Sequence, residues 1–115
     1  MHQKNYKRRI EKFHGNKCEG GIVRSYSPIM TAYANLLETD DEVLKYSCNY
    51  EIVIAEGEYT SDFVVTLKNG NIRVRECCTR TAPATVRTAH LLDASRNYWR
   101  SNGVTDWGLV VNAKK

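Results

Sequence analysis

The sequence predicts an α/β fold, with a mixed central sheet, one helix on each side and the element order α-β-β-β-α-β. Apolar residues recur at helical spacing in two segments, about residues 27–41 and 85–101. Runs rich in β-branched and aromatic residues lie between them, separated by short turn signals. One more apolar run follows the second helix, so that helix crosses over to a last strand beside the others. At 115 residues the chain is long enough for a single modest core.

Before the first helix the chain is strongly basic. The whole sequence has 17 basic and 13 acidic residues, a net charge of +4, but its first seventeen residues hold only one acid, Glu11. The basic residues there are Lys4, Lys7, Arg8, Arg9, Lys12 and Lys17. We expect residues 1–21 to be a basic N-terminal arm and residues 22–115 to be the folded domain. The arm is either a solvated tail or a segment that contacts a polyanion such as nucleic-acid phosphates.

No apolar run approaches the length of a membrane span, and no apolar segment follows the basic N-terminus. We therefore expect a cytoplasmic protein. The four cysteines, Cys18, Cys48, Cys77 and Cys78, include no Cys-x-x-Cys pair, and adjacent strand residues point to opposite faces. Reduced thiols are the better interpretation, and a zinc site is the weaker one.

The first helix begins at Ser27-Pro28, because serine is a good N-cap and proline suits the first helical position. The run Thr39-Asp40-Asp41 ends it. The expected buried face consists of Ile29, Ala32, Tyr33, Leu36 and Leu37.

Strand segments are predicted at residues 43–46 and 50–55, separated by residues 47–49. A turn is expected at residues 56–58. Two further apolar segments, residues 59–65 and 72–78, flank the turn signal Lys68-Asn69-Gly70 and are expected to form a hairpin.

Two registers are open for this hairpin. A two-residue turn would place Asp62 opposite Cys77, with Glu76 on the other face. A three-residue loop with Gly70 in the left-handed conformation sets Asp62 directly across from Glu76. We prefer the second register on functional grounds, since two adjacent carboxylates repel unless a metal or a proton lies between them.

The second helix is predicted over residues 85–101, and Asn102-Gly103 is a good C-terminal cap. A final strand is expected over residues 107–111. The residues predicted on or near the buried side of the helix are Leu91, Leu92, Ser95, Tyr98 and Trp99.

Asp62 and Glu76 are the candidate metal ligands. Magnesium prefers hard oxygen ligands and keeps water and substrate phosphate in its remaining positions, so two carboxylates are sufficient protein ligands. A bound Mg²⁺ or Mn²⁺ would polarise a phosphoryl oxygen and activate a water for phosphodiester cleavage.

These residues carry a resemblance to a known family. The run at residues 58–63 (EYTSDF) followed by Glu76-Cys77-Cys78 resembles the core of PD-(D/E)XK nucleases, which have a restriction-endonuclease-like fold. Residues 27–41, Asn97-Tyr98-Trp99 and Asp106-Trp107-Gly108 are similar to the TnsA-type endonuclease subunit of heteromeric transposases. The resemblance implies DNA as substrate, Asp62 and Glu76 as catalytic metal ligands, and a DDE-type transposase as protein partner.

The sequence departs from the family at two positions. Cys78 occupies the position of the family's lysine, and Met30, or Pro28 in a shifted alignment, occupies that of the helix glutamate. A cysteine here is otherwise a small buried apolar residue. Arg80 is the nearest candidate to replace the lysine's charge, and Arg87 and His90 on the second helix are others.

Several basic residues are candidate DNA contacts: Lys7, Arg8, Arg9 and Lys12 in the arm, and Arg73 and Arg75 in the hairpin. Three functions remain open. The first is a metal-dependent DNA endonuclease with an altered site. The second is a catalytically degenerate DNA-binding or assembly module of the same fold, and the third is a small phage DNA-processing nuclease.

Overall fold

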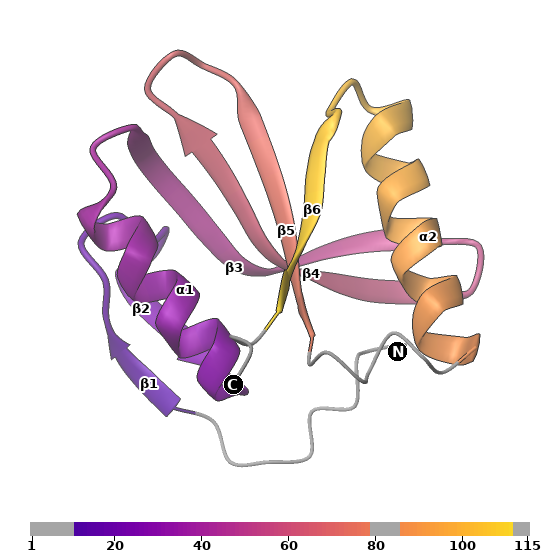
Figure 1. The fold of residues 1–115 in the computed structure, drawn as a ribbon, viewed down its shortest axis with the longest axis horizontal. Coiled ribbons are helices and arrows are strands. Elements are labelled where there is room, and N and C mark those ends of the chain that lie inside the picture. The colour runs from indigo at the N-terminus through magenta and orange to yellow at the C-terminus, as the bar shows by residue number, and fades with distance from the viewer. Residues whose placement is uncertain (1–10, 79–85, 112–115) are drawn as a thin grey trace.

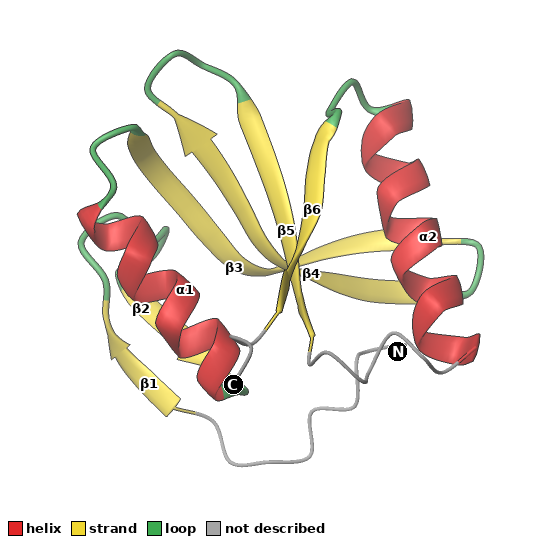
Figure 2. Cartoon of the chain, viewed as in Figure 1, coloured by secondary structure: helices red, strands yellow, loops and turns green. Residues whose placement is uncertain are grey.

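The computed structural model of the chain describes residues 11–78 and 86–111 (Figures 1 and 2). A two-stranded sheet pairs β1 with β2, and a four-stranded mixed sheet has the order β3-β4-β5-β6. The predicted α/β class, with a mixed sheet and two helices, is confirmed. The elements are β1 (Glu11–His14), β2 (Ile22–Ser25), α1 (Pro28–Thr39), β3 (Val43–Ile54), β4 (Gly57–Leu67), β5 (Ile72–Cys78), α2 (Val86–Ser101) and β6 (Asp106–Val111).

Part of the segment assigned to the basic arm is a strand. Residues 11–14 form β1, which pairs antiparallel with β2 so that Lys12 lies opposite Arg24 and Phe13 opposite Val23. Val23 is fully buried, and this small sheet therefore packs on the rest of the fold. Residues 1–10 of the arm lie outside the described part of the chain.

The helix α1 begins and ends where the sequence predicts. The Ser27 hydroxyl accepts a hydrogen bond from the Met30 N–H at 3.2 Å, as an N-cap does. The buried side is rotated from the predicted one, because it is centred on Met30, Ala34 and Leu37. Leu36, predicted to be buried, is 63% exposed. Periodicity indicated that α1 has an apolar face, but two overlapping stripes fitted it and only packing decides between them.

Strand β3 is continuous, so the prediction of two segments separated at residues 47–49 is wrong. Asn49 takes a left-handed backbone conformation, φ 54°, inside the strand, which asparagine tolerates better than most residues. Beyond Asn49 the paired strands β3 and β4 swing across to lie under α2 (Figure 1). The ladder thus bends at a local distortion without breaking.

The β4–β5 hairpin has the three-residue loop. The Leu67 N–H donates to the Asn71 carbonyl at 2.9 Å, and Gly70 has a φ of 91°. Val64 lies opposite Val74, and Thr66 lies opposite Ile72. The preferred register is therefore confirmed.

The second helix and the last strand also follow the prediction. Gly103 has a φ of 86°, and the Val104 N–H donates to the Trp99 carbonyl at 2.9 Å, so α2 ends in a glycine cap. β6 then pairs in parallel with β5.

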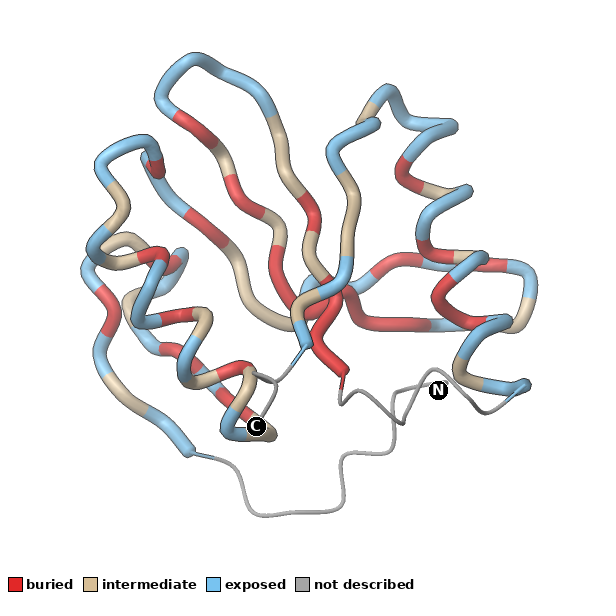
Figure 3. Tube along the Cα trace, in the orientation of Figure 1, coloured by how far each residue is buried: buried red, intermediate tan, exposed pale blue. Residues whose placement is uncertain are grey.

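One apolar cluster lies between each helix and the strands that it covers. Figure 3 shows buried residues along both helices and along the strands. The cluster under α1 includes Met30, Leu37, Phe63 and Val65. The cluster under α2 includes Ile52, Tyr59, Val74, Leu91 and Trp99. Neither helix in the described residues is long and apolar enough to span a membrane.

Candidate functional site

The structure brings Asp62 and Glu76 together at the point where β4 and β5 part. The backbone ladder of the hairpin runs from Thr66–Ile72 to Phe63–Arg75 and stops there. One residue further on, side chains take over the pairing. The Asp62 N–H donates to Glu76 Oε1 at 3.0 Å, and the Cys77 N–H donates to Asp62 Oδ2 at 2.7 Å. Each carboxylate thus accepts a hydrogen bond from the backbone of the opposite strand.

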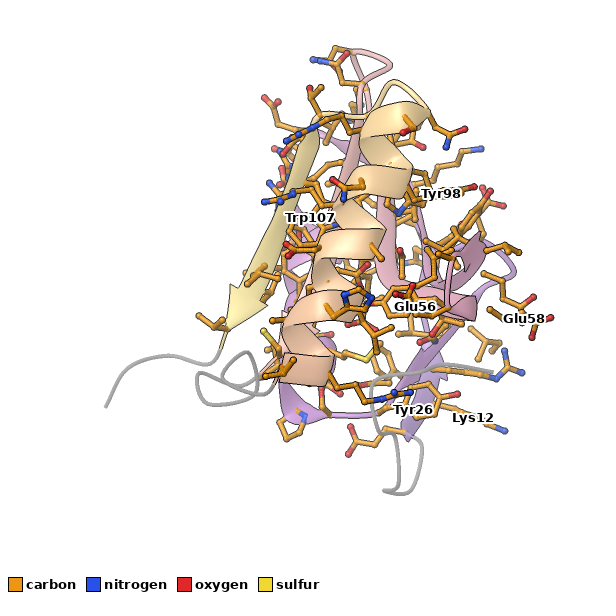
Figure 4. The ribbon with its side chains drawn as sticks, turned by 90° about the vertical axis from the view of Figure 1, so that its right-hand side faces the viewer. Lys12, Tyr26, Glu56, Glu58, Tyr98 and Trp107 are labelled. Carbon is orange, nitrogen blue, oxygen red and sulfur yellow. The ribbon has the colours of Figure 1, made fainter. Side chains whose placement is uncertain are left out.

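Glu76 is also tied to α2 and β6. The Ser95 hydroxyl donates to Glu76 Oε2 at 2.7 Å, and the Trp107 indole N–H donates to Ser95 Oγ at 3.1 Å. A neighbouring bond joins α2 to β4, since the Trp99 indole N–H donates to Ser61 Oγ at 3.0 Å. Figure 4 shows Trp107 of β6 lying beside α2. The acid pair is therefore the centre of a polar network that holds β4, β5, β6 and α2 together.

Sequence reasoning missed Ser95 and Trp107 as members of this site. Ser95 was predicted on the buried side of α2, and Trp107 at the start of the last strand, but neither was assigned a partner. The available signal was a hydroxyl among apolar helix positions, because a buried polar side chain almost always finds a hydrogen-bond partner. Its partner is on another element, so spacing along the chain does not identify it.

The site is closed. Asp62, Glu76 and Ser95 each have 0% of their surface exposed. A buried carboxylate is costly unless donors satisfy it, and here at least three of the four carboxylate oxygens accept a hydrogen bond from the protein. The burial is therefore compensated by fixed donors within the fold.

A divalent metal fits this site in one respect and not in another. Carboxylate oxygens are the ligands that Mg²⁺ prefers, and an oxygen that accepts one hydrogen bond keeps a second lone pair. Mg²⁺ also keeps several waters and a substrate phosphate, and a fully enclosed pair has no open side for them. Within residues 11–78 and 86–111 no group of three or more His, Cys, Asp or Glu side chains is placed to hold a metal ion. The closed arrangement therefore leaves no room at the acid pair for a metal together with its waters and a phosphate.

The positions that depart from the nuclease pattern are filled by apolar packing. Cys78 is 7% exposed and lies opposite Val111 in the β5–β6 pair. Met30 is fully buried under α1. The one acid in α1, Glu38, lies at the other end of the helix, where it accepts a hydrogen bond from the Tyr46 hydroxyl at 2.7 Å. It also accepts from the Asn16 N–H at 3.0 Å, so its role is to hold the loop after β1.

Two of the candidate replacements for the lysine, Arg87 and His90, lie on α2. Arg80 lies outside the described residues. His90 of α2 pairs through Nε2 with Glu56 in the β3–β4 turn, beside a groove of about 570 Å³, and Arg87 is on the exposed side of α2. Figure 4 shows Glu56 at the α2 side of the molecule.

The hairpin arginines are engaged by one carboxylate. Asp106 of β6 is 2.8 Å from Arg75 Nη2 and 3.4 Å from Arg73 Nε. Burial acts to raise the pKa of Asp106, but the hydrogen bonds and charges of Arg75 and Arg73 outweigh it and hold that pKa below its ordinary value. The two arginine side chains are each about three-quarters buried. They are therefore largely committed to the sheet and are weak candidates for phosphate contact.

Lys12 is the predicted DNA contact that the structure leaves most open. It is exposed on β1, directly across from the exposed Arg24 of β2, and it projects away from the body of the protein (Figure 4). Lys7, Arg8 and Arg9 lie outside the described residues, immediately before β1 in the sequence.

Fold and site together define an α/β protein with a mixed sheet and a buried acid pair where two strands separate. The chain matches no protein-family model and no curated protein.

Proposed function

We propose that this chain is a DNA-processing protein of the PD-(D/E)XK type that no longer cuts DNA and acts as a DNA-binding or assembly subunit. One observation carries the proposal. Asp62 and Glu76 stand on neighbouring strands, in the positions that such a nuclease would use, yet both are fully buried and hydrogen-bonded within the protein. In a cutting enzyme these oxygens would have to reach a metal, water and a phosphate.

The substituted residues support the same interpretation. Cys78 is a buried thiol where the family has a lysine. The position of the family's helix glutamate falls to Met30, a buried thioether, or to Pro28 in the shifted alignment, and neither carries a charge. Loss of one preorganised charge from a transition-state site typically costs about 3 kcal/mol or more, which lowers the rate by two or more orders of magnitude. Loss of two such groups leaves little basis for efficient cleavage.

The small β1–β2 sheet supplies the best phosphate contact. Lys12 and Arg24 are directly opposite each other, and like charges in that position repel across a strand pair. An anion bound between them would relieve that repulsion. In the sequence, the basic residues Lys7, Arg8 and Arg9 come shortly before the same strand, so positive charge is concentrated in this part of the chain. A DDE-type transposase is the protein partner that the family resemblance implies.

A second candidate function is metal-dependent cleavage, as in a transposase endonuclease subunit or a small phage nuclease. The donor chemistry of Asp62 and Glu76 favours it, since two carboxylates side by side are a suitable set for Mg²⁺ or Mn²⁺. This function requires the acid pair to open to solvent when DNA and metal bind.

Nicking of supercoiled plasmid separates the two functions. Wild-type protein and Asp62→Asn are compared with Mg²⁺ and with Mn²⁺, and we expect no nicking by either. Nicking by wild type that the Asp62→Asn substitution abolishes would overturn the proposal in favour of the nuclease.

DNA binding is tested in parallel by fluorescence anisotropy of a labelled duplex over a salt series. We expect the double variant Lys12→Ala/Arg24→Ala to bind DNA at least about tenfold more weakly than wild type. Its affinity should also depend less steeply on salt concentration. The matched control is Lys68→Ala, an exposed lysine in the β4–β5 loop, which should bind like wild type. Equal binding by wild type and the double variant would remove β1–β2 as the DNA surface.

A further inference from the structure

Two cysteines far apart in the sequence lie side by side. Cys18, in the loop between β1 and β2, has its sulfur 3.8 Å from the sulfur of Cys48 in β3. A disulfide bond has a sulfur–sulfur distance of about 2.05 Å, so the two atoms need to approach by less than about 2 Å. Side-chain rotation can supply an adjustment of that size.

The backbone holds the two cysteines in place from both sides. The residues flanking Cys18 are clamped to Tyr46, because the Tyr46 N–H donates to the Lys17 carbonyl at 2.9 Å and the Glu19 N–H donates to the Tyr46 carbonyl at 2.8 Å. Tyr46 precedes Cys48 by two positions on the same face of β3. On the other side, the Asn49 side-chain amide donates to the Arg24 carbonyl at 3.0 Å. The pair is thus positioned by the fold rather than by chance contact of mobile ends.

We propose that Cys18 and Cys48 form a reversible disulfide bond, with a low-molecular-weight disulfide such as oxidised glutathione as the oxidant. The half-buried Cys48 loses its proton, and its sulfur attacks one glutathione sulfur, breaks the glutathione disulfide and releases one glutathione thiol. The Cys18 sulfur, also deprotonated, attacks the Cys48 sulfur of this mixed disulfide and releases the second glutathione. Two protons and two electrons pass from the protein to glutathione, and the protein becomes lighter by about 2 Da.

The environment of the two thiols determines the rate of this reaction. Burial raises the pKa of Cys18 and of Cys48 above the ordinary value. The neighbouring Cys18 sulfur raises the pKa of Cys48 further, whereas the hydrogen bond with Cys48 partly offsets the rise at Cys18. The attacking species is the thiolate, so the bond forms slowly at neutral pH and faster as pH rises. Cys77 and Cys78 provide an internal comparison, because both are buried in the sheet and adjacent strand residues point to opposite faces.

Peptide mapping tests the proposal on the full chain. Folded protein is incubated with oxidised glutathione at pH 8.5, alkylated in denaturant and digested with trypsin without reduction. Trypsin yields separate peptides for the three cysteine regions, namely residues 18–24, 46–68 and 76–80. We expect peptides 18–24 and 46–68 to be joined, and peptide 76–80 to be alkylated at both Cys77 and Cys78.

Thermal unfolding gives a second readout. The bond closes a segment that contains β2 and α1, and by the loop-entropy relation a closed segment of this length raises the melting temperature by about 15 °C. Dithiothreitol should reverse the shift. Cys18→Ser and Cys48→Ser should each abolish both the joined peptide and the shift, whereas Cys78→Ser should retain them.

Two results would overturn the proposal. One is full alkylation of Cys18 and Cys48 after oxidation of the folded protein, and the other is glutathione attached singly to either residue without a joined peptide. If a serine variant does not fold, the wild-type peptide map still decides the question.

Discussion

Replacing Ser95 with alanine removes one hydroxyl from the centre of the polar network. That hydroxyl donates to Glu76 Oε2 at 2.7 Å and accepts from the Trp107 indole N–H at 3.1 Å. Ser95 and Glu76 are fully buried, so water cannot take the place of the lost group without a rearrangement. A hydrogen bond to a carboxylate contributes about 1.5–3 kcal/mol, and the partly buried Trp107 indole left without its acceptor adds about 1 kcal/mol.

We therefore expect Ser95→Ala to lower the free energy of unfolding by about 3 kcal/mol. In a chain of 115 residues this corresponds to a melting temperature lower by roughly 10 °C. Urea unfolding followed by far-ultraviolet circular dichroism measures the free energy of unfolding. Circular dichroism is preferred to tryptophan fluorescence because Trp107 belongs to the network and the substitution would alter its emission. The control is Ser101→Ala, an exposed serine at the end of the same helix, which should change stability by less than about 0.5 kcal/mol. A Ser95→Ala protein as stable as the control would show that the network does not hold the acid pair in place.

Three further substitutions test the packing and charge arrangement. Leu37→Ala should lower the free energy of unfolding by about 3 kcal/mol in a urea titration, because Leu37 is buried. Leu36→Ala, at a position that is 63% exposed, should lower it by less than about 0.5 kcal/mol. The reverse order would contradict the buried face described for α1. Gly15→Ala should lower it by about 2 kcal/mol in the same assay, because the added methyl would lie 2.7 Å from a Val23 methyl carbon; a neutral result would show that the loop yields easily. Asp106 has a lowered pKa, so its contribution is present above the ordinary aspartate pKa and is lost as pH falls through the lowered value. Asp106→Asn should therefore lower stability at pH 7 by about 1 kcal/mol at most, since the side chain is 46% exposed, and should change little at pH 2; an equal loss at both pH values would rule out the ion pair as its cause.

The hairpin was predictable from its turn signal, but two registers fitted that signal and a functional argument chose between them. Gly70 suits the left-handed position of a three-residue loop, and that loop alone places Asp62 opposite Glu76. The buried face of α1 was not predictable in the same way. Ile29, Leu36 and Met30 all lie on plausible stripes, and the choice depends on which side the sheet covers.

The continuity of β3 and the closure of the site depend on partners distant in the sequence. Residues 47–49 look like a break, yet β4 pairs on both sides of Asn49 and carries the strand through it. Likewise Ser95 completes Glu76 from nineteen residues away, across a helix. Local pattern reports which residues favour a strand or a cap, whereas these two features are set by which elements meet.

Under the proposed function, the cysteine at the family's lysine position and the closure of the acid pair have one physical cause. A lysine two residues after Glu76 would share its face of β5, and its ammonium would need water or a counter-charge, because a buried unpaired charge is very costly. A cysteine has no such requirement and is buried readily, as Cys78 is at 7% exposure. Because no ammonium group needs hydration, β5 and β6 can pair closely at this end. Donors of the protein can then form hydrogen bonds with the carboxylate oxygens. On this reasoning Cys78→Lys should lower stability and open the acid pair, so the variant should bind Mn²⁺ more tightly than wild type. Manganese titration followed by electron paramagnetic resonance measures the binding, with Cys78→Ser as the control. Equal Mn²⁺ binding by all three proteins would show that the residue at position 78 does not determine whether the acid pair is closed.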